Sequence, residues 1–118
     1  MIDMNEPQKI SVPVKLYNNF LNELINQIFK ILPIYEDCIK SKDKSLNPYL
    51  VHLDNVVTQI LGANYFFYDN TFFSVATILK GLQEINSPSQ KKVKSIVFCC
   101  IDKLSKLKRD EVEENVLL

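Results

Sequence analysis

The chain has 118 residues, of which 47% are hydrophobic and 24% are charged, and its formal net charge is zero. This length fits a single domain, and the apolar content excludes disorder of the whole chain. The zero net charge excludes a global electrostatic attraction to nucleic acid or to an anionic membrane surface.

A flexible N-terminal segment over 1–10 is expected to precede a helical domain over 11–109. The first helix is predicted from about Pro13 to Ile39, because apolar residues recur there at alternating spacings of three and four. This buried stripe consists of Tyr17, Leu21, Leu24, Ile28, Ile31, Tyr35 and Cys38. Pro33 lies inside the run, but the stripe keeps its phase across it. We therefore predict one helix kinked at Pro33, and the alternative is two helices broken there.

A second helix is predicted to begin at Pro48, after a polar connection. Its expected buried residues are Leu50, Leu53, Val57, Ile60 and Leu61. Its end within 62–68 is left open. Asp69 and Asn70 supply a turn and a cap for a third helix over about 71–85. The buried face of this third helix is predicted to hold Phe72, Val75, Ala76, Ile78, Leu79 and Leu82.

A fourth helix is predicted over about 88–109, and an acidic tail over 110–118 that frays. Three prolines follow capping residues closely, which is typical of helix starts: Pro13 after Ser11, Pro48 after Asn47 and Pro88 after Ser87. The fourth helix is expected to bury Val93, Val97, Cys100, Leu104 and Leu107, supported by Ile96 and Ile101. Together the four segments predict an all-α fold, an antiparallel four-helix bundle with a long, Pro33-kinked first helix.

The cysteines are odd in number and two of them are adjacent, which argues against a disulfide framework: Cys38, Cys99 and Cys100. The N-terminus lacks the features of a signal peptide, and no apolar run is long enough to span a membrane. We therefore expect a cytoplasmic protein in a reducing compartment. Frequent isoleucine, lysine and asparagine, with only two alanines, indicate an AT-rich genome such as that of a bacterium or a phage.

No pattern in the sequence predicts catalytic, cofactor-binding or metal-binding residues. His52, the only histidine, falls beside Asn55 and Gln59 on the polar side of its helix and is expected at the surface. Adjacent cysteines on a helix do not converge on one metal ion, so Cys38 and Cys100 are assigned to the core and Cys99 to the surface. The acidic pairs at 36–37 and 110–114 are expected to be solvated.

Lysines cluster on the fourth helix. Lys91, Lys92, Lys103, Lys106 and Arg109 fall within one arc opposite the buried stripe, which is typical of a solvated helix face. The alternative is a contact with nucleic-acid phosphates. Arg109 is the only arginine, which disfavours a phosphate-clamping function.

Four phenylalanines, Phe29, Phe66, Phe73 and Phe98, fall outside the predicted buried stripes. Either the core is broader than these stripes, or the rings form a contact surface for another protein or for a second copy of the chain. With Lys91 and Lys94 they are the candidate partner-binding residues.

We expect a non-enzymatic, inhibitor-type binding protein that docks another protein through this aromatic and lysine-bearing helix face. Small helical bundles often have immunity, antidote or mobile-element accessory roles, which is an association at the level of the fold. The alternative is a nucleic-acid-associated regulator that uses the basic face formed by Lys92, Lys103, Lys106 and Arg109. An enzyme is the least favoured class, because four apolar stripes leave no polar cleft.

Overall fold

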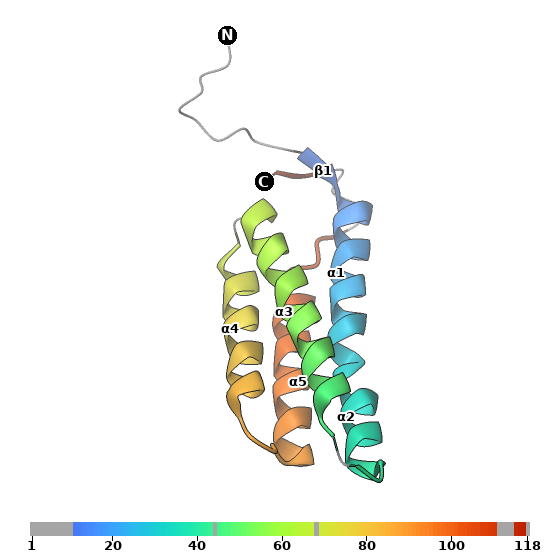
Figure 1. The fold of residues 1–118 in the computed structure, drawn as a ribbon. Helices are drawn as coiled ribbons and strands as arrows, with labels where there is room; N and C mark the ends of the chain where they lie inside the picture. The colour runs from blue at the N-terminus through green and yellow to red at the C-terminus, as the bar shows by residue number, and fades with distance from the viewer. Residues whose placement is uncertain (1–10, 44, 68, 111–114, 118) are drawn as a thin grey trace.

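A computed structural model describes residues 11–43, 45–67, 69–110 and 115–117. Its helices form four antiparallel rods (Figure 1). The first rod is α1 (Val14–Phe29) continued by α2 (Ile31–Lys40), and it is followed by α3 (Asn47–Phe67), α4 (Asn70–Glu84) and α5 (Gln90–Ser105). The helix α3 packs against α4 and the first rod, and α5 packs against α4 and the first rod on the other side. The prediction of an all-α bundle is confirmed.

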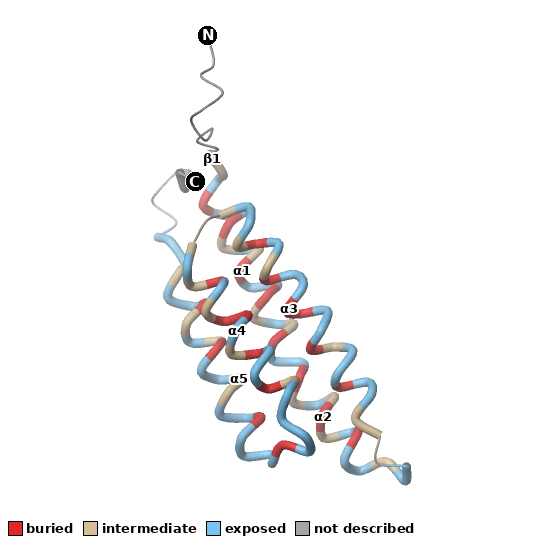
Figure 2. The backbone as a smooth tube through the Cα atoms, turned by 60° about the vertical axis from the view of Figure 1, so that its left-hand side comes forward, coloured by how far each residue is buried: buried red, intermediate tan, exposed pale blue. Residues whose placement is uncertain are grey.

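The core draws side chains from every rod, and Figure 2 shows that buried residues recur along all of them. All seven residues of the predicted first stripe are buried. The prediction for α3 is partly wrong, because Leu50 is exposed and Leu61 is half-buried, whereas Tyr49 and Val56 are buried. Since α3 contacts both α4 and the first rod, it buries two adjoining faces rather than one narrow stripe. Ile78, Ile96, Ile101 and Leu107, also expected in the core, are half-buried at its edge.

The first rod is interrupted at Lys30, three residues before Pro33. Proline has no N–H to donate to the carbonyl four residues earlier, which belongs to Phe29. Lys30 keeps a helical backbone conformation, and its carbonyl accepts from the Ile34 N–H at 3.2 Å. The hydrogen-bond pattern is therefore that of two helices, while the buried stripe continues in phase through both, as a kinked rod requires.

The end of α3, which the sequence left open, is at Phe67, so the helix continues through Gly62. Asp69 caps α4 as predicted, by accepting from the Thr71 N–H at 2.8 Å. Both ends of α5 differ from the predicted ones. Ser89, rather than Ser87, caps α5, and its hydroxyl oxygen accepts from the Lys92 N–H at 3.1 Å. The helix α5 ends at Ser105 rather than near 109.

Two short strands lie together at one end of the bundle (Figure 1). β1 (Ser11–Pro13) pairs antiparallel with β2 (Asn115–Leu117), and Val12 is opposite Val116. Most of the acidic tail predicted over 110–118 lies outside the described residues, and β2 is its described part besides Asp110. The flexible segment predicted for 1–10 lies outside the described residues. Of the described helices, none combines the length and the apolar content that crossing a membrane requires.

Candidate functional site: exposed aromatic surfaces

The four phenylalanines that fall outside the predicted stripes are all exposed. The exposed fractions of Phe29, Phe66, Phe73 and Phe98 are 50%, 49%, 57% and 46%. The alternative prediction, a broad core that covers these rings, is therefore wrong. Single exposed rings are common on protein surfaces, whereas contiguous apolar patches mark surfaces that bind another molecule.

Phe29 and Phe98 meet across the first rod and α5. Their ring centroids are 6.3 Å apart and the ring planes make an angle of 69°, an edge-to-face contact. The two rings line a pocket of about 310 Å³. The other residues that line it are Leu32, Tyr35, Glu36, Gln90 and Lys94. The structure therefore brings together three of the predicted partner-binding residues, namely Phe29, Phe98 and Lys94.

Phe66 belongs to a different surface, at the end of the bundle that carries the strands. It lines a groove between α1 and α3, and we call this the end groove, formed by Val12, Leu16, Phe20, Phe66 and Phe67. Two adjoining pockets of about 460 and 490 Å³ make up the groove and share Phe20, Phe66 and Phe67. Leu16 is 60% exposed there. Phe73 lies on α4 and lines neither of these pockets nor the Phe29–Phe98 pocket.

Sequence reasoning identified Phe66 but missed the rest of the end groove. Leu16 and Phe20 are four residues apart and each directly precedes a stripe residue, Tyr17 or Leu21. The signal that could have revealed them was this second apolar row beside the first. Phe67 anchors the groove, because its ring contacts those of Tyr17, Phe20, Phe66 and Phe72 at centroid distances of 5.1–5.8 Å.

The predicted basic arc is divided by the structure. Lys103 and Lys106 line a pocket against α4 together with Asn70, Thr71, Ser74 and Leu107, and Lys106 makes an ion pair of 3.1 Å with Asp102. Arg109 follows the end of α5, where Asn18 of α1 holds its backbone through two hydrogen bonds of 2.8 and 2.9 Å. Lys91, Lys92 and Lys94 are exposed near the start of α5.

His52 differs from its predicted place at the surface. It is half-buried, and its Nε2 lies 2.7 Å from the carbonyl oxygen of Gln27 in α1. Since a carbonyl only accepts, Nε2 must carry the proton of this hydrogen bond. In an uninterrupted helix Gln27 would accept from the Ile31 N–H, and the interruption at Lys30 falls between the two. His52 therefore satisfies the backbone where the first rod is broken, which is a structural role.

The cysteines lie as predicted, with Cys38 and Cys100 buried and Cys99 exposed. Burial raises the pKa of the Cys100 thiol to about 12, with a smaller contribution from Cys99, so this thiol stays protonated at neutral pH. Within the part of the chain that the structure describes, no group of three or more histidine, cysteine, aspartate or glutamate side chains is placed to hold a metal ion. Glu36 accepts a hydrogen bond of 2.7 Å from the Gln90 side chain, and Asp37 is exposed.

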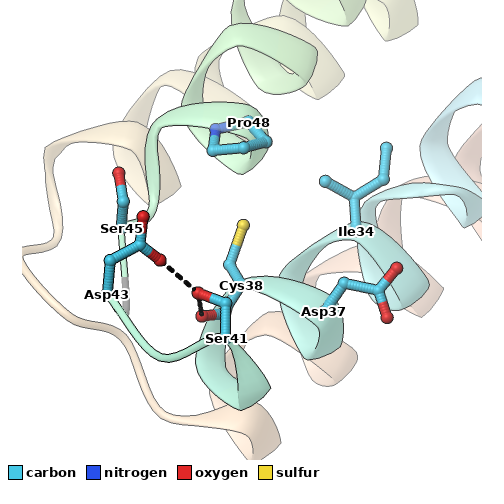
Figure 3. A pocket seen from close by; sticks show the side chains of 7 residues that line it. All are labelled: Ile34, Asp37, Cys38, Ser41, Asp43, Ser45 and Pro48. Carbon is cyan, nitrogen blue, oxygen red and sulfur yellow. Dashed lines mark hydrogen bonds between the residues drawn. The ribbon is translucent and has the colours of Figure 1, made fainter.

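A pocket of about 440 Å³ lies at the turn between α2 and α3 (Figure 3). The thiol of Cys38 points into it, and the Ser41 hydroxyl donates to Asp43 at 2.6 Å. This hydrogen bond, followed by bonds from the backbone, lowers the pKa of the Asp43 carboxyl group. The polar groups of the pocket thus stabilise the turn itself, and a nucleophile paired with a base is not among the described residues that line it.

Comparison with protein families, with curated proteins and with solved structures finds no match to this chain.

Proposed function

We propose that the chain is a non-enzymatic binding protein that docks another protein on its exposed aromatic surfaces. The end groove is the single observation that carries this proposal. Most of its lining is apolar, the polar residues of its two pockets being Asn19, Glu23 and Gln59. Leu16 and Phe66 leave much of their side chains in solvent. An apolar groove between two helices is the usual receptor for the apolar face of a partner helix.

Leu16 and Phe66 belong neither to the buried core nor to the partly buried residues packed against it. Buried residues from all four rods already form one cluster, and Phe20 and Phe67 pack on its edge. Exposing additional leucine and phenylalanine costs solubility without adding to the stability of the monomer. A partner that covers them would recover about 25 cal/mol for each Å² of apolar surface removed from water.

The proposal is tested by comparing variants in affinity capture from the lysate of the native host. We expect the double variant Leu16→Ala with Phe66→Ala to lose the proteins that the unaltered chain retains. Val51→Ala is the matched control, because Val51 is exposed on α3 but lies outside the groove. Equal capture by all three proteins would refute the proposal, provided that their circular dichroism spectra agree.

Light scattering during size-exclusion chromatography separates the two kinds of protein partner. A dimer that is lost in the double variant identifies the occupant as a second copy of the chain. A monomer that still captures a different protein through Leu16 and Phe66 identifies a heterologous partner. Both results support docking in the end groove.

A further inference from the structure

The second aromatic surface differs from the end groove in its charge. We call it the aromatic–lysine face and define it by Phe29, Phe98, Lys91 and Lys94. Phe98, Lys94 and Lys91 are spaced by four and three residues along α5, so they lie on one side of this helix. Lys94 lines the same pocket as the two rings.

Within the described part of the chain, no ion pair offsets the charge of the lysines on this face. Lys91, Lys92 and Lys94 make no ion pair with a carboxylate among the residues that the structure describes. Glu36 is the carboxylate within the pocket, and its Oε1 is engaged by the Gln90 amide rather than by a lysine. The first half of α5 therefore presents positive charge beside an exposed aromatic pair.

The position of these lysines is unfavourable for the helix itself. The N-terminus of a helix carries partial positive charge, so acidic residues there are stabilising and basic residues are destabilising. The first turn of α5 has no acidic residue and contains Lys91 and Lys92. Local rules of helix stability are broken most often where a function requires it.

We propose that the aromatic–lysine face binds an acidic, amphipathic segment of a partner protein. Apolar side chains of the segment contact Phe29 and Phe98, and its carboxylates pair with Lys91 and Lys94. These carboxylates also offset the unfavourable positive charge at the start of α5. This inference rests on the proposed function and names the chemistry of the partner.

The test uses two synthetic amphipathic helical peptides with the same leucine and tryptophan face. One carries glutamates on its polar face and the other carries lysines, and binding is followed by fluorescence anisotropy. We expect the acidic peptide to bind at least about tenfold more tightly than the basic one, with an affinity that falls as salt is added.

Single variants place the binding on this face. Phe98→Ala is expected to lower the affinity for the acidic peptide by about tenfold, as for a contact residue at the centre of an interface. Lys94→Glu should lower the affinity for the acidic peptide and raise the affinity for the basic one. A misfolded protein would not produce this reversal. Tyr65→Ala, which removes an exposed ring from α3 outside the pocket, is the matched control and should bind like the unaltered chain.

Several outcomes would overturn the inference. These are binding of neither peptide, equal binding of both, or an affinity that Phe98→Ala leaves unchanged. Tight binding of duplex DNA that depends on Lys91 and Lys94 but not on Phe98 would assign the lysines to nucleic acid instead. None of these results touches the end groove, so loss of capture in the Leu16 and Phe66 double variant would still support the proposed function.

Discussion

The hydroxyl group of Tyr49 offers a sharp test of the core. Tyr49 is buried in α3, and its hydroxyl oxygen has no hydrogen-bond partner among the described residues. Its ring contacts that of Tyr35 at a centroid distance of 5.2 Å, and the Tyr35 hydroxyl donates to the buried carbonyl of Pro88. The two neighbouring tyrosines therefore differ in whether the hydroxyl is satisfied, which makes them a matched pair.

We expect Tyr49→Phe to raise the free energy of unfolding and Tyr35→Phe to lower it. An unsatisfied buried polar group costs about 1–3 kcal/mol, because it loses its hydrogen bonds to water on folding. Removing the Tyr49 hydroxyl recovers part of this cost, about 1 kcal/mol. Removing the Tyr35 hydroxyl loses a hydrogen bond worth about 1 kcal/mol and leaves the Pro88 carbonyl unsatisfied. The two variants should thus differ by about 2 kcal/mol or more.

Urea unfolding followed by circular dichroism measures the free energy of unfolding of both variants. The two values can be compared directly if the free energy falls with urea concentration at the same slope in both. In a domain of this size, 1 kcal/mol corresponds to a change in Tm of about 4 °C. A spectrophotometric titration adds a second readout, since burial raises the pKa of Tyr49, with a smaller contribution from Tyr35. The reasoning is refuted if Tyr49→Phe destabilises the protein as much as Tyr35→Phe does.

Two further predictions concern the interior. His52→Ala should lower the free energy of unfolding, measured by urea unfolding, by about 1 kcal/mol, because the Gln27 carbonyl loses its donor. Gln59→Ala, at an exposed position of α3, is the control and should change this free energy little. Equal effects of the two variants would contradict the role assigned to His52. Stability should also fall as pH rises above about 9, because the raised pKa of Cys100 makes the folded state retain a proton that the unfolded state releases. The loss approaches about 1.4 kcal/mol per pH unit for this group, and the raised pKa values of Tyr17 and Tyr49 add losses of the same sign above pH 10. Urea midpoints between pH 8 and pH 10 measure the effect, and Cys100→Ala should reduce it.

Local periodicity predicted the first rod better than it predicted α3. The stripe from Tyr17 to Cys38 faces one continuous interior, so its spacing by three and four identifies every buried member. The helix α3 buries Tyr49 and the adjacent pair Val56 and Val57, a wider face than a single row of residues spaced by three and four describes. The path of α3 through Gly62 was also beyond local reasoning. One glycine costs a helix about 1 kcal/mol, and burial of the neighbouring Ile60 and Ala63 offsets it.

The candidate surfaces could be predicted only as single residues. The phase of each helix indicated that Phe29 and Phe98 point away from the predicted stripes, and both are exposed. Their contact with each other depends on how the first rod and α5 are rotated against one another, which sequence spacing does not encode. The same limit applied to His52, because its partner is the backbone carbonyl of Gln27, 25 residues earlier, next to the break in the first rod.

Binding and stability are separable in this fold, and that separation makes the tests of function decisive. Truncating a fully buried phenylalanine such as Phe72 is expected to cost about 3–5 kcal/mol, a large part of the stability of a small domain. Phe29, Phe66 and Phe98 leave about half of their side chains in solvent, so they contribute much less to folding. A variant of these rings that keeps its helical spectrum and loses its ligand has therefore lost a binding surface rather than a core. The exposed rings and the fully buried side chains are different residues of the same helices, so each set can be altered while the other is measured.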